Sequence, residues 1–300
     1  MNLPKIAIVV LTWNKASDVM ECLESLTGLN YPDYEIIVVD NHSTDNTVEE
    51  VRKKYPGHTL IVNSSDLGYA GGNNAGLKYA LGKEFKYIFV LSNDTKADPD
   101  CLRELVIIME GDTSIGAAGP VIHDYYNTDQ IILSGDKISW ITGKLMYNRI
   151  NKLSFNETAV EMRYLNGSAV LFRTEVLKLT GIFDEKYFLF YEDADLSLRI
   201  RQSGYKAVLA AASKIYHKES QATGWIYSPV ALYYGTRNRL LFMKKYSSKL
   251  SWMLFITVFF PLSIMKNLYK WRKEPVKRLA FLHGMMDYYN NRFGARGEYL

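Results

Sequence analysis

Polar side chains that could bind a ligand follow each of the first four predicted strands, at the point where the strand ends. The four runs cover residues 12–14 (TWN), 40–45 (DNHSTD), 66–74 (DLGYAGGNN) and 92–95 (SNDT). Any one run is typical of a helix cap, because Asp, Asn, Ser and Thr side chains accept hydrogen bonds from the first turn of a helix. Four runs in succession favour a ligand-binding edge, since parallel sheets bind ligands at the carboxyl ends of their strands.

Three further residues could supply the chemistry at this edge. Asp94 ends a strand in a Ser-Asn-Asp turn, where its carboxylate could bind a hard divalent cation that bridges a diphosphate. His217 follows a later strand and could be a second ligand, more naturally for manganese, although a lone histidine in a loop is more often structural. Asp193 lies among acidic neighbours beside an aromatic stretch, which would raise its pKa as a general base requires. The alternative role for this acidic cluster is stabilisation of a helix N-terminus.

The elements that must position these residues alternate along the chain. Strands are predicted at 5–12, 34–39, 59–62 and 87–91, and helices at 16–26, 44–55, 73–82 and 99–109. Residues 123–162 are predicted to form loops with a hairpin near 138–147. A strand at 165–172, helices at 174–180 and 192–203 and a strand at 205–210 follow. This order predicts an α/β fold, a mostly parallel sheet with helices on both faces.

Composition and missing motifs exclude several classes of protein. Of the 300 residues, 48% are hydrophobic and 23% charged, which excludes a disordered chain. Only two cysteines are present, Cys22 and Cys101, which argues against a disulfide scaffold and fits a reducing compartment. The apolar run 6–11 is too short for a signal-peptide core. No P-loop, no Gly-x-Gly-x-x-Gly after the first strand and no Gly-x-Ser-x-Gly occurs, which disfavours nucleotide triphosphatases, dinucleotide-dependent dehydrogenases and esterases.

The C-terminal 66 residues differ in charge from the rest of the chain. Residues 235–300 contain 13 Lys and Arg against three acids, whereas residues 1–234 contain 23 against 29. A basic tail predicts contact with something anionic, either nucleic acid or a membrane surface. Within it, residues 250–265 carry no charge and are interrupted by Pro261, with basic and aromatic flanks. This pattern favours a helix in the membrane interface over 244–273, ahead of a core helix or dimer face, and ahead of a span, which needs ~20 residues.

Several motifs together resemble a known family. VVLTWN, IIVVDNHSTDNT, SDLGYAGGNNAG, FVLSNDT, the long segment from LNGSAV to RIRQSGY and the later His217 are similar to family 2 glycosyltransferases of the GT-A fold. The rhamnosyltransferase-like branch, which builds bacterial surface polysaccharides, is the nearest group, and the resemblance covers about residues 5–220. It implies a catalytic domain at 1–234, with a nucleotide-binding half at 1–121 and an acceptor and catalytic half at 122–234. A basic amphipathic helical region follows at 235–300.

The resemblance also implies roles for individual residues. Asp193 would be the catalytic base, with Glu192 as its nearest rival. Asp94 would bind Mg²⁺ or Mn²⁺ together with His217, although Ser92 replaces the first acid of the family's Asp-x-Asp motif. Asp40 would bond the pyrimidine ring of the donor. The other donor-binding residues would be Thr12, Asn14, Asn41, Gly68, Gly71, Gly72, Asn73 and Asn93, of which the glycines would form a loop close to the ligand. Support of the acceptor would come from Glu192, Asp195, Trp225 and Arg237.

The function that follows is an inverting sugar transfer. The donor would be dTDP-rhamnose or a UDP-sugar, and the acceptor a hydroxyl of a glycan or lipid-linked glycan in surface polysaccharide assembly. The protein would work in the cytoplasm, on the inner face of the cell membrane. A homodimer is compatible with this function, and nucleic acid is not expected as a partner. The alternatives are an inactive nucleotide-sugar-binding subunit and a sugar nucleotidyltransferase, whose glycine-rich signature Trp13-Asn14 matches poorly. A nucleic-acid binder would leave the acidic strand edge unexplained.

Overall fold

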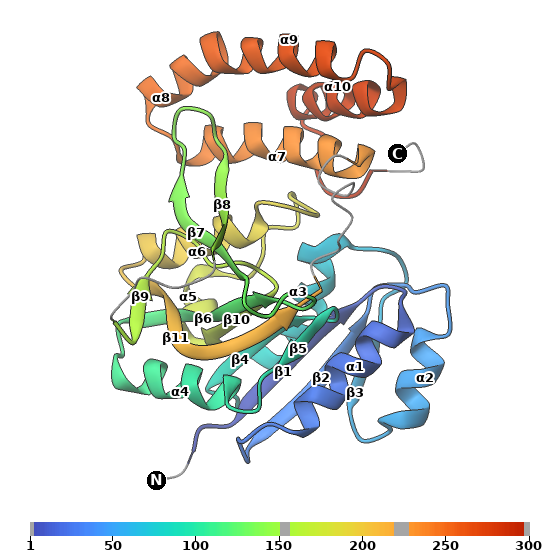
Figure 1. Cartoon of the computed structure of the whole chain (residues 1–300), viewed down its shortest axis with the longest axis vertical. Coiled ribbons are helices and arrows are strands. Elements are labelled where there is room, and N and C mark those ends of the chain that lie inside the picture. Colours follow the sequence, from blue (N-terminus) through green and yellow to red (C-terminus); the bar gives the residue numbers. More distant parts are fainter. Residues whose placement is uncertain (1–2, 151–156, 219–227, 297–300) are drawn as a thin grey trace.

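A computed structural model describes residues 3–150, 157–218 and 228–296 of the chain, and its core is one mixed sheet (Figure 1). The order of its main path is β3-β2-β1-β4-β10-β6-β11-β5. The parallel part pairs β1 with β2 and β4, and β2 with β3. Its strands and helices are β1 (Ile6–Thr12), α1 (Ala16–Thr27), β2 (Tyr34–Asp40), α2 (Thr47–Lys54), β3 (Thr59–Val62), α3 (Gly68–Leu81), β4 (Tyr87–Ser92) and α4 (Cys101–Gly111). The alternation predicted from hydrophobic periodicity is therefore confirmed.

Strand β1 shows why this part folds as two layers of helices around a sheet. All seven of its residues are buried. Ile6, Ile8 and Val10 join the core cluster that contains α1 and α4 residues, and Ala7 and Val9 join the cluster on the other face, with α3. An uninterrupted apolar strand is what two covered faces require, because successive side chains point to opposite sides.

The second part of the sheet contains antiparallel pairs. Strand β10 pairs antiparallel with both β4 and β6, and β11 runs parallel to β6 and antiparallel to β5 and β9. The predicted hairpin is present as β7 and β8. The elements of this part are β5 (Thr95–Ala97), β6 (Ile115–Asp124), β7 (Ile131–Ile138), β8 (Leu145–Ile150), β9 (Ala159–Glu161), β10 (Ala169–Arg173), α5 (Thr174–Thr180), α6 (Glu192–Gln202) and β11 (Lys206–His217).

Several elements and boundaries differ from the sequence prediction. Strand β6 was not predicted, because Gly116, Gly119 and Pro120 are poor strand formers. The glycine at 116 is required by packing, since a Cβ there would lie 2.9 Å from Ile200 and Tyr205 atoms. Strand β11 continues to His217 beyond the predicted end at 210, and helix α3 begins at Gly68 rather than at Asn73.

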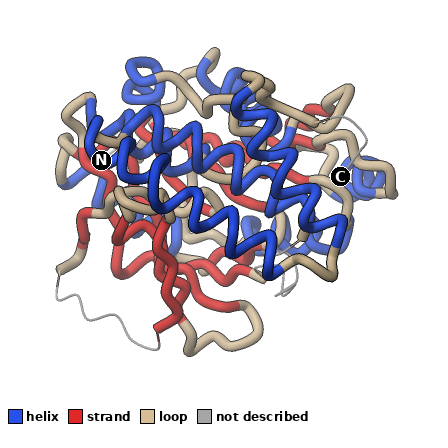
Figure 2. Tube along the Cα trace, turned by 90° about the horizontal axis from the view of Figure 1, so that it is seen from above, coloured by secondary structure: helices blue, strands red, loops and turns tan. Residues whose placement is uncertain are grey.

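Four helices form a layer above the sheet that we call the helical cap, residues 229–289. They are α7 (Pro229–Tyr246), α8 (Lys249–Leu254), α9 (Phe260–Lys270) and α10 (Pro275–Tyr289). Figure 2, which looks down on the cap, shows its long helices running side by side over the strands. The β7–β8 hairpin reaches up to the cap in Figure 1, where Trp140 stacks on Phe242 of α7. The predicted domain boundary between residues 234 and 235 falls inside α7.

Helices α8 and α9 are joined without a break, contrary to the predicted interruption at Pro261. A π-helical turn at Phe255–Phe259 lies between them and precedes the proline. Because proline has no backbone N–H, one carbonyl of the preceding turn loses its helical donor. A π-helical turn lets the helix continue past that point. The joined helix Lys249–Lys270 is 22 residues long, and its most apolar 18-residue window has a mean hydropathy of 1.4, so it is long and apolar enough to cross a membrane by those two criteria. Only 11% of its apolar window is buried, so it is not a core helix.

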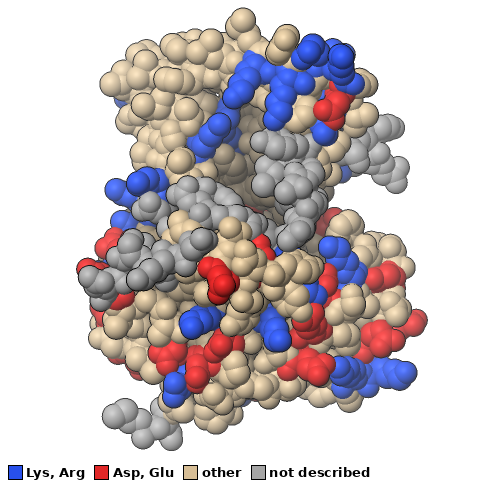
Figure 3. Space-filling model, viewed as in Figure 1, with Lys and Arg blue, Asp and Glu red and all other residues tan. Residues whose placement is uncertain are grey.

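The outer side of this joined helix is an apolar stripe. Its exposed members follow helical spacing: Leu250, Leu254, Val258, Leu262, Met265 and Tyr269. Figure 3 shows Lys and Arg gathered on the cap beside a broad uncharged area, whereas acids and bases alternate over the body below. We call these six residues the outer stripe.

Candidate active site

Side-chain hydrogen bonds connect the ends of neighbouring strands at the predicted edge. Asn93 after β4 donates to the Thr12 hydroxyl of β1 over 3.1 Å. Asn14 accepts from the Thr44 amide at 2.9 Å, while its own amide donates to Ser43. The structure thus brings Thr12, Asn14 and Asn93 together, as predicted from their positions after parallel strands.

Asp40 and Asn41 end β2 but differ in how their side chains are used. One Asp40 oxygen accepts from the Ser43 amide at 2.9 Å, and the other is buried with no partner among the described residues. Such an oxygen requires an explanation, because buried polar atoms are normally hydrogen-bonded. Asn41 uses both ends of its amide on the Asp66–Gly68 turn, so it supports the edge rather than facing a ligand.

The predicted glycine loop is the first part of helix α3, which corrects the prediction for these residues. A Cβ at Gly72 would lie 2.6 Å from Leu11, and one at Gly71 would lie 2.8 Å from Leu67. These glycines therefore let the helix pack closely on β1 and on its own entry. Asn73 is fully buried and its amide nitrogen donates to the Tyr69 carbonyl, while its side-chain oxygen has no partner among the described residues. Gly68, with φ of 67°, forms the turn into α3, and a Cβ there would meet Phe188.

Asp94 and His217 meet across the paired strands β5 and β11. The His217 Nε2 atom lies 3.2 Å from the Asp94 Oδ1 atom. Burial acts to raise the pKa of Asp94, but the hydrogen bond and charge of His217 outweigh it, and the pKa lies below the usual value. Among the described residues no third His, Cys, Asp or Glu joins them. One carboxylate and one imidazole fit a divalent cation that takes its remaining ligands from a diphosphate and water.

Asp193 lies in the first turn of α6, on the same side of the molecule as this pair. Its Oδ2 accepts from the Gly167 amide at 3.1 Å and its Oδ1 from the Ala194 amide at 2.7 Å. Burial raises the pKa of Asp193 to about 6, and these two amides act against the rise. Neighbouring Glu192 is buried, and both burial and the Asp193 charge hold its pKa well above the usual value. One Glu192 oxygen has no partner among the described residues.

Tyr69 lies between Asp193 and the Asp94–His217 pair. Its hydroxyl donates to the Gly167 carbonyl, on the turn whose amide holds Asp193. Burial raises the pKa of Tyr69 well above its usual value, and the charges of Glu192, Asp193 and Asp94 raise it further. All three carboxylates therefore lie around this one phenol. The sequence prediction assigned no role to Tyr69 or to Gly167, although both lie in the quoted motifs SDLGYAGGNNAG and LNGSAV.

Two residues predicted to support the acceptor are structural instead. Asp195 is fully buried and accepts from Arg199 at 2.8 Å, Lys245 at 2.6 Å and Tyr246 at 2.8 Å. Arg237 is 1% exposed, and its guanidinium donates to backbone carbonyls, so it faces no ligand. The sequence shows that these residues are charged but not that helix α7 buries them. Trp225 lies outside the described residues.

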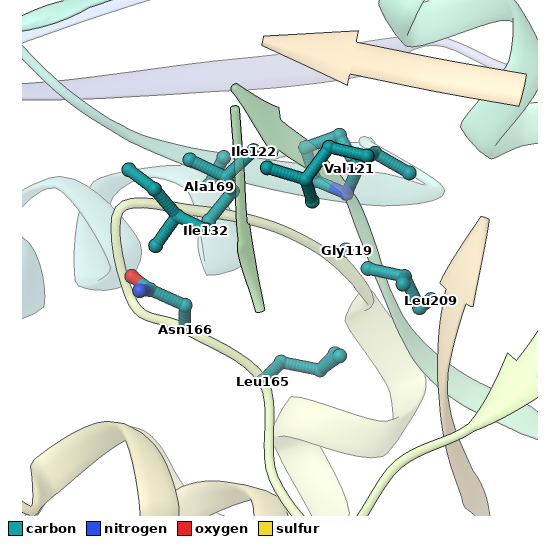
Figure 4. A pocket seen from close by; sticks show the side chains of 10 residues that line it. Gly119, Val121, Ile122, Ile132, Leu165, Asn166, Ala169 and Leu209 are labelled. Carbon is teal, nitrogen blue, oxygen red and sulfur yellow. The ribbon is translucent and has the colours of Figure 1, made fainter. Parts of the chain in front are cut away.

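A small pocket between β6, β7, β11 and the turn that contains Asn166 is shown in Figure 4 and is too small to be the substrate site. Its free volume is about 10 Å³, which is room for about one water molecule. Its lining is mostly aliphatic, from Val121 and Ile122 of β6, Ile132 of β7 and Leu209 of β11. Asn166, next to Gly167, is its one polar side chain, so the pocket adjoins the site without accommodating a sugar.

Comparison with known proteins identifies the class. The family model "Glycosyl transferase family 2" matches residues 7–180, more than half of the chain. An N-acetylglucosaminyl-diphospho-decaprenol L-rhamnosyltransferase of Mycobacterium tuberculosis is 25% identical over 72% of this chain and 77% of its own length. A dTDP-rhamnosyl transferase, RfbF, of Shigella flexneri is 23% identical over 79% of each chain.

Solved structures agree in fold. A mannosyltransferase from Pyrobaculum calidifontis, in complex with GDP-Man and Mn²⁺, superposes with a TM-score of 0.61 at 15% identity, over 96% of this chain and 88% of that one. Residues 1–349 of S. aureus TarS with UDP-GlcNAc give 0.61 at 18% identity, over 95% and 80%. These likenesses show that the fold is of the GT-A type. The chain belongs to glycosyl transferase family 2, within which its relatives include rhamnosyltransferases.

Proposed function

We propose that this glycosyltransferase moves a sugar from a nucleoside diphosphate to a hydroxyl of a lipid-linked glycan in one displacement, with Asp193 as the base. The observation that carries the proposal is the position and pKa of Asp193. Its carboxylate is fixed by two backbone amides, and burial brings its pKa to about 6. A base with that pKa is ionised at neutral pH and still accepts a proton readily.

The base of the donor would lie against Asp40. The buried Asp40 oxygen, which has no partner among the described residues, would accept the N3–H of uracil or thymine, in line with the contact to the pyrimidine ring that the resemblance implies. Two relatives are named as rhamnosyltransferases, one of them dTDP-dependent, so dTDP-rhamnose is the first donor to test. TarS was solved with UDP-GlcNAc, which keeps a UDP-sugar as the second.

Asp94 and His217 would hold Mg²⁺ or Mn²⁺. When bound, such an ion supplies positive charge that stabilises the leaving diphosphate. Both the mannosyltransferase structure and a GalNAc-T7 structure were obtained with Mn²⁺. Ser92 replaces the first acid of the family motif, so the protein would provide few ligands and the diphosphate would complete the set.

The transfer itself needs one proton movement. Asp193 would take the proton from the acceptor hydroxyl as that oxygen attacks the anomeric carbon. The nucleoside diphosphate would leave from the opposite face, so the new bond has the inverted configuration. No carboxylate nucleophile is needed, in contrast to a double displacement.

The outer stripe of the cap would contact the membrane that contains the acceptor. Its six apolar side chains are 38–70% exposed. Lys249, Lys266 and Lys270 lie on the same helix, and Arg272 and Lys273 follow it. An apolar face with basic neighbours suits the interface of an anionic lipid leaflet. One relative is named for an acceptor on decaprenol, which fits a peripheral protein on the cytoplasmic face of the cell membrane.

The experiment is a donor panel on the purified protein with Mn²⁺ or Mg²⁺, in which release of TDP and UDP is measured. A polyprenyl-diphosphate-linked N-acetylglucosamine would be present as acceptor. We expect metal-dependent release from one donor, lowered about 10²–10⁴-fold in Asp193→Asn and about 10²-fold in Asp94→Ala. Asp112→Asn should match the wild type, because Asp112 pairs with Lys206 at the amino ends of β6 and β11, away from the strand carboxyl ends.

Two outcomes would change the proposal. An Asp193→Asn variant that keeps most of its turnover would overturn the assigned base and move the role to Glu192. A protein that binds no nucleoside diphosphate would overturn the transferase itself. If nucleoside diphosphates bind but no donor and acceptor pair reacts, the inactive nucleotide-sugar-binding subunit becomes the better description.

A further inference from the structure

The segment directly before the proposed base has an unusual backbone. Phe188, Phe190 and Tyr191 have φ values of 63°, 71° and 75°. Bulky residues rarely adopt this left-handed region, and they keep it only where surrounding contacts enforce it. Tyr191 is the N-cap residue directly before α6, so the backbone here determines where Glu192 and Asp193 point.

Helix α7 of the cap provides the contacts that hold this segment. The Asn238 amide nitrogen lies 2.8 Å from the Tyr187 and Leu189 carbonyl oxygens and 2.9 Å from that of Phe190. Asn238 is fully buried. Carbonyls that a helix or sheet would normally satisfy are therefore bound by one side chain from a distant part of the sequence.

Arg237 supports both Asn238 and the start of the segment. Its Nε donates to the Asn238 side-chain oxygen at 3.0 Å, which orients the amide. Its Nη2 donates to the Lys186 and Tyr187 carbonyls, each at 2.9 Å. The planar guanidinium can make these bonds simultaneously because its donors have a fixed geometry.

The other side of the segment is attached to the predicted donor side of the site. The Phe188 carbonyl accepts from the Ala70 amide of α3 at 3.1 Å. A Cβ on Gly68 would lie 2.4 Å from that same carbonyl oxygen. The segment is thus held between the start of α3 and the Arg237–Asn238 pair.

We propose that Arg237 and Asn238 are positioning residues for the transfer, which hold residues 186–191 so that the Asp193 carboxylate faces the acceptor hydroxyl. This inference rests on the proposed role of Asp193. It gives the cap a part in catalysis that a membrane contact alone does not require. Neither residue touches the substrates, because both are buried behind the segment they hold.

The test replaces Asn238 by aspartate, which has nearly the same shape but no amide hydrogens to donate. Asn238→Asp is compared with Asn267→Asp, which removes an amide that bonds the Ser263 carbonyl within α9. Leu240→Ala, a buried truncation on the side of α7 that packs on Phe255 and Phe260, controls for lost stability. Transfer rate, nucleoside diphosphate affinity, the pH profile and hydrogen exchange of residues 187–195 are measured in the full chain.

We expect Asn238→Asp to lower kcat about 100-fold while the Kd for the nucleoside diphosphate changes less than about threefold. The acid limb of its pH profile should shift, and exchange at 187–195 should rise about tenfold. Asn267→Asp should match the wild type, and Leu240→Ala should keep its kcat and pH profile. If Asn238→Asp does not fold, Arg237→Lys, which keeps the charge but loses the fork, is used for the same measurements.

Either of two results would overturn the inference: a kcat and exchange pattern unchanged in the Asn238 or Arg237 variant, or an equal loss of kcat in Leu240→Ala. If the wild type itself transfers no sugar, the proposed function fails. Hydrogen exchange then still decides whether the pair holds the segment.

Discussion

The body and the helical cap distribute polar and apolar residues in opposite ways. In the body, Val9, Val10 and their neighbours fill the interior, and the polar side chains gather at the strand ends. In the cap, Arg237 and Asn238 are buried while Met265 and Tyr269 are 69% and 70% exposed. Soluble proteins rarely leave apolar residues exposed as a continuous stripe, and such patches mark interaction sites.

This difference separates the cap into a polar inner face and an apolar outer face. Its inner face binds backbone carbonyls of residues 186–190, which need hydrogen-bond donors. The stripe on its outer face is apolar except for the Tyr269 hydroxyl, which suits a non-aqueous partner. Each of the following experiments changes one side of this comparison.

The largest effect is expected from pH acting on the body. Because the pKa of Asp193 is about 6, its carboxylate is mostly protonated below that value, and a protonated Asp193 could not act as the proposed base. The transfer rate should fall about tenfold per pH unit below pH 6, or about 100-fold by pH 4. The measurement is kcat/KM against pH for the wild type, with nucleotide binding followed at each pH as a control. A rate that stays flat through pH 6 would remove Asp193 as the base.

A smaller effect is expected at the outer stripe. Leu262→Glu together with Met265→Glu should lower binding to vesicles with anionic lipid about 30-fold, because two apolar contacts are lost and acids are repelled. Vesicle co-sedimentation measures this. Ile107→Glu, which changes a 54% exposed isoleucine on α4 of the body, is the matched control and should bind like the wild type. Unchanged vesicle binding, with loss of a dimer in sedimentation velocity, would instead make the stripe a dimer face.

The smallest effect compares one glycine in each region. A Cβ on Gly76 of α3 would lie 2.4 Å from Val9 and 2.9 Å from Val39. Gly76→Ala should therefore lower the free energy of unfolding by about 1–3 kcal/mol. Gly235 of α7 has open space around it, so Gly235→Ala should raise the free energy of unfolding by about 0.5–1 kcal/mol. Urea unfolding measures both, and equal signs for the two variants would contradict the packing described here.

The sequence predicts the body well because its signals are local. Buried strands such as β1 are continuous apolar runs, and the residues at their carboxyl ends meet in space for topological reasons alone. The positions of Thr12, Asn14, Asn93 and Asp94 follow from this. The start of α3 does not, because glycines are typical of loops and their use for close helix packing depends on Leu11 and Val9, which are distant in sequence.

The sequence predicts less well those features whose burial depends on residues distant in the sequence, both in the cap and in the second part of the sheet. Arg237 and Asp195 have the types expected of a ligand site, yet their partners are the 186–187 backbone and residues of α7. Strand β6 is missed for a similar reason, since its glycines and proline are tolerated through contacts with α6 and β11 rather than by strand propensity. Charge alone therefore does not distinguish a binding arginine from a structural one.

The hydrogen bonds of α7 also bear on how the enzyme is made. Asp193 and the segment before it leave the ribosome well before Asn238, and earlier still than Gly294, whose amide bonds the Lys186 carbonyl. Most of the α/β body can collapse during synthesis, because its two large core clusters contain no residue of the cap. The backbone of residues 186–191, by contrast, gains its hydrogen bonds to Arg237 and Asn238 only after the cap has been translated. A nascent chain would therefore acquire its sheet first and its competent base last, close to the moment at which the outer stripe becomes available to the membrane.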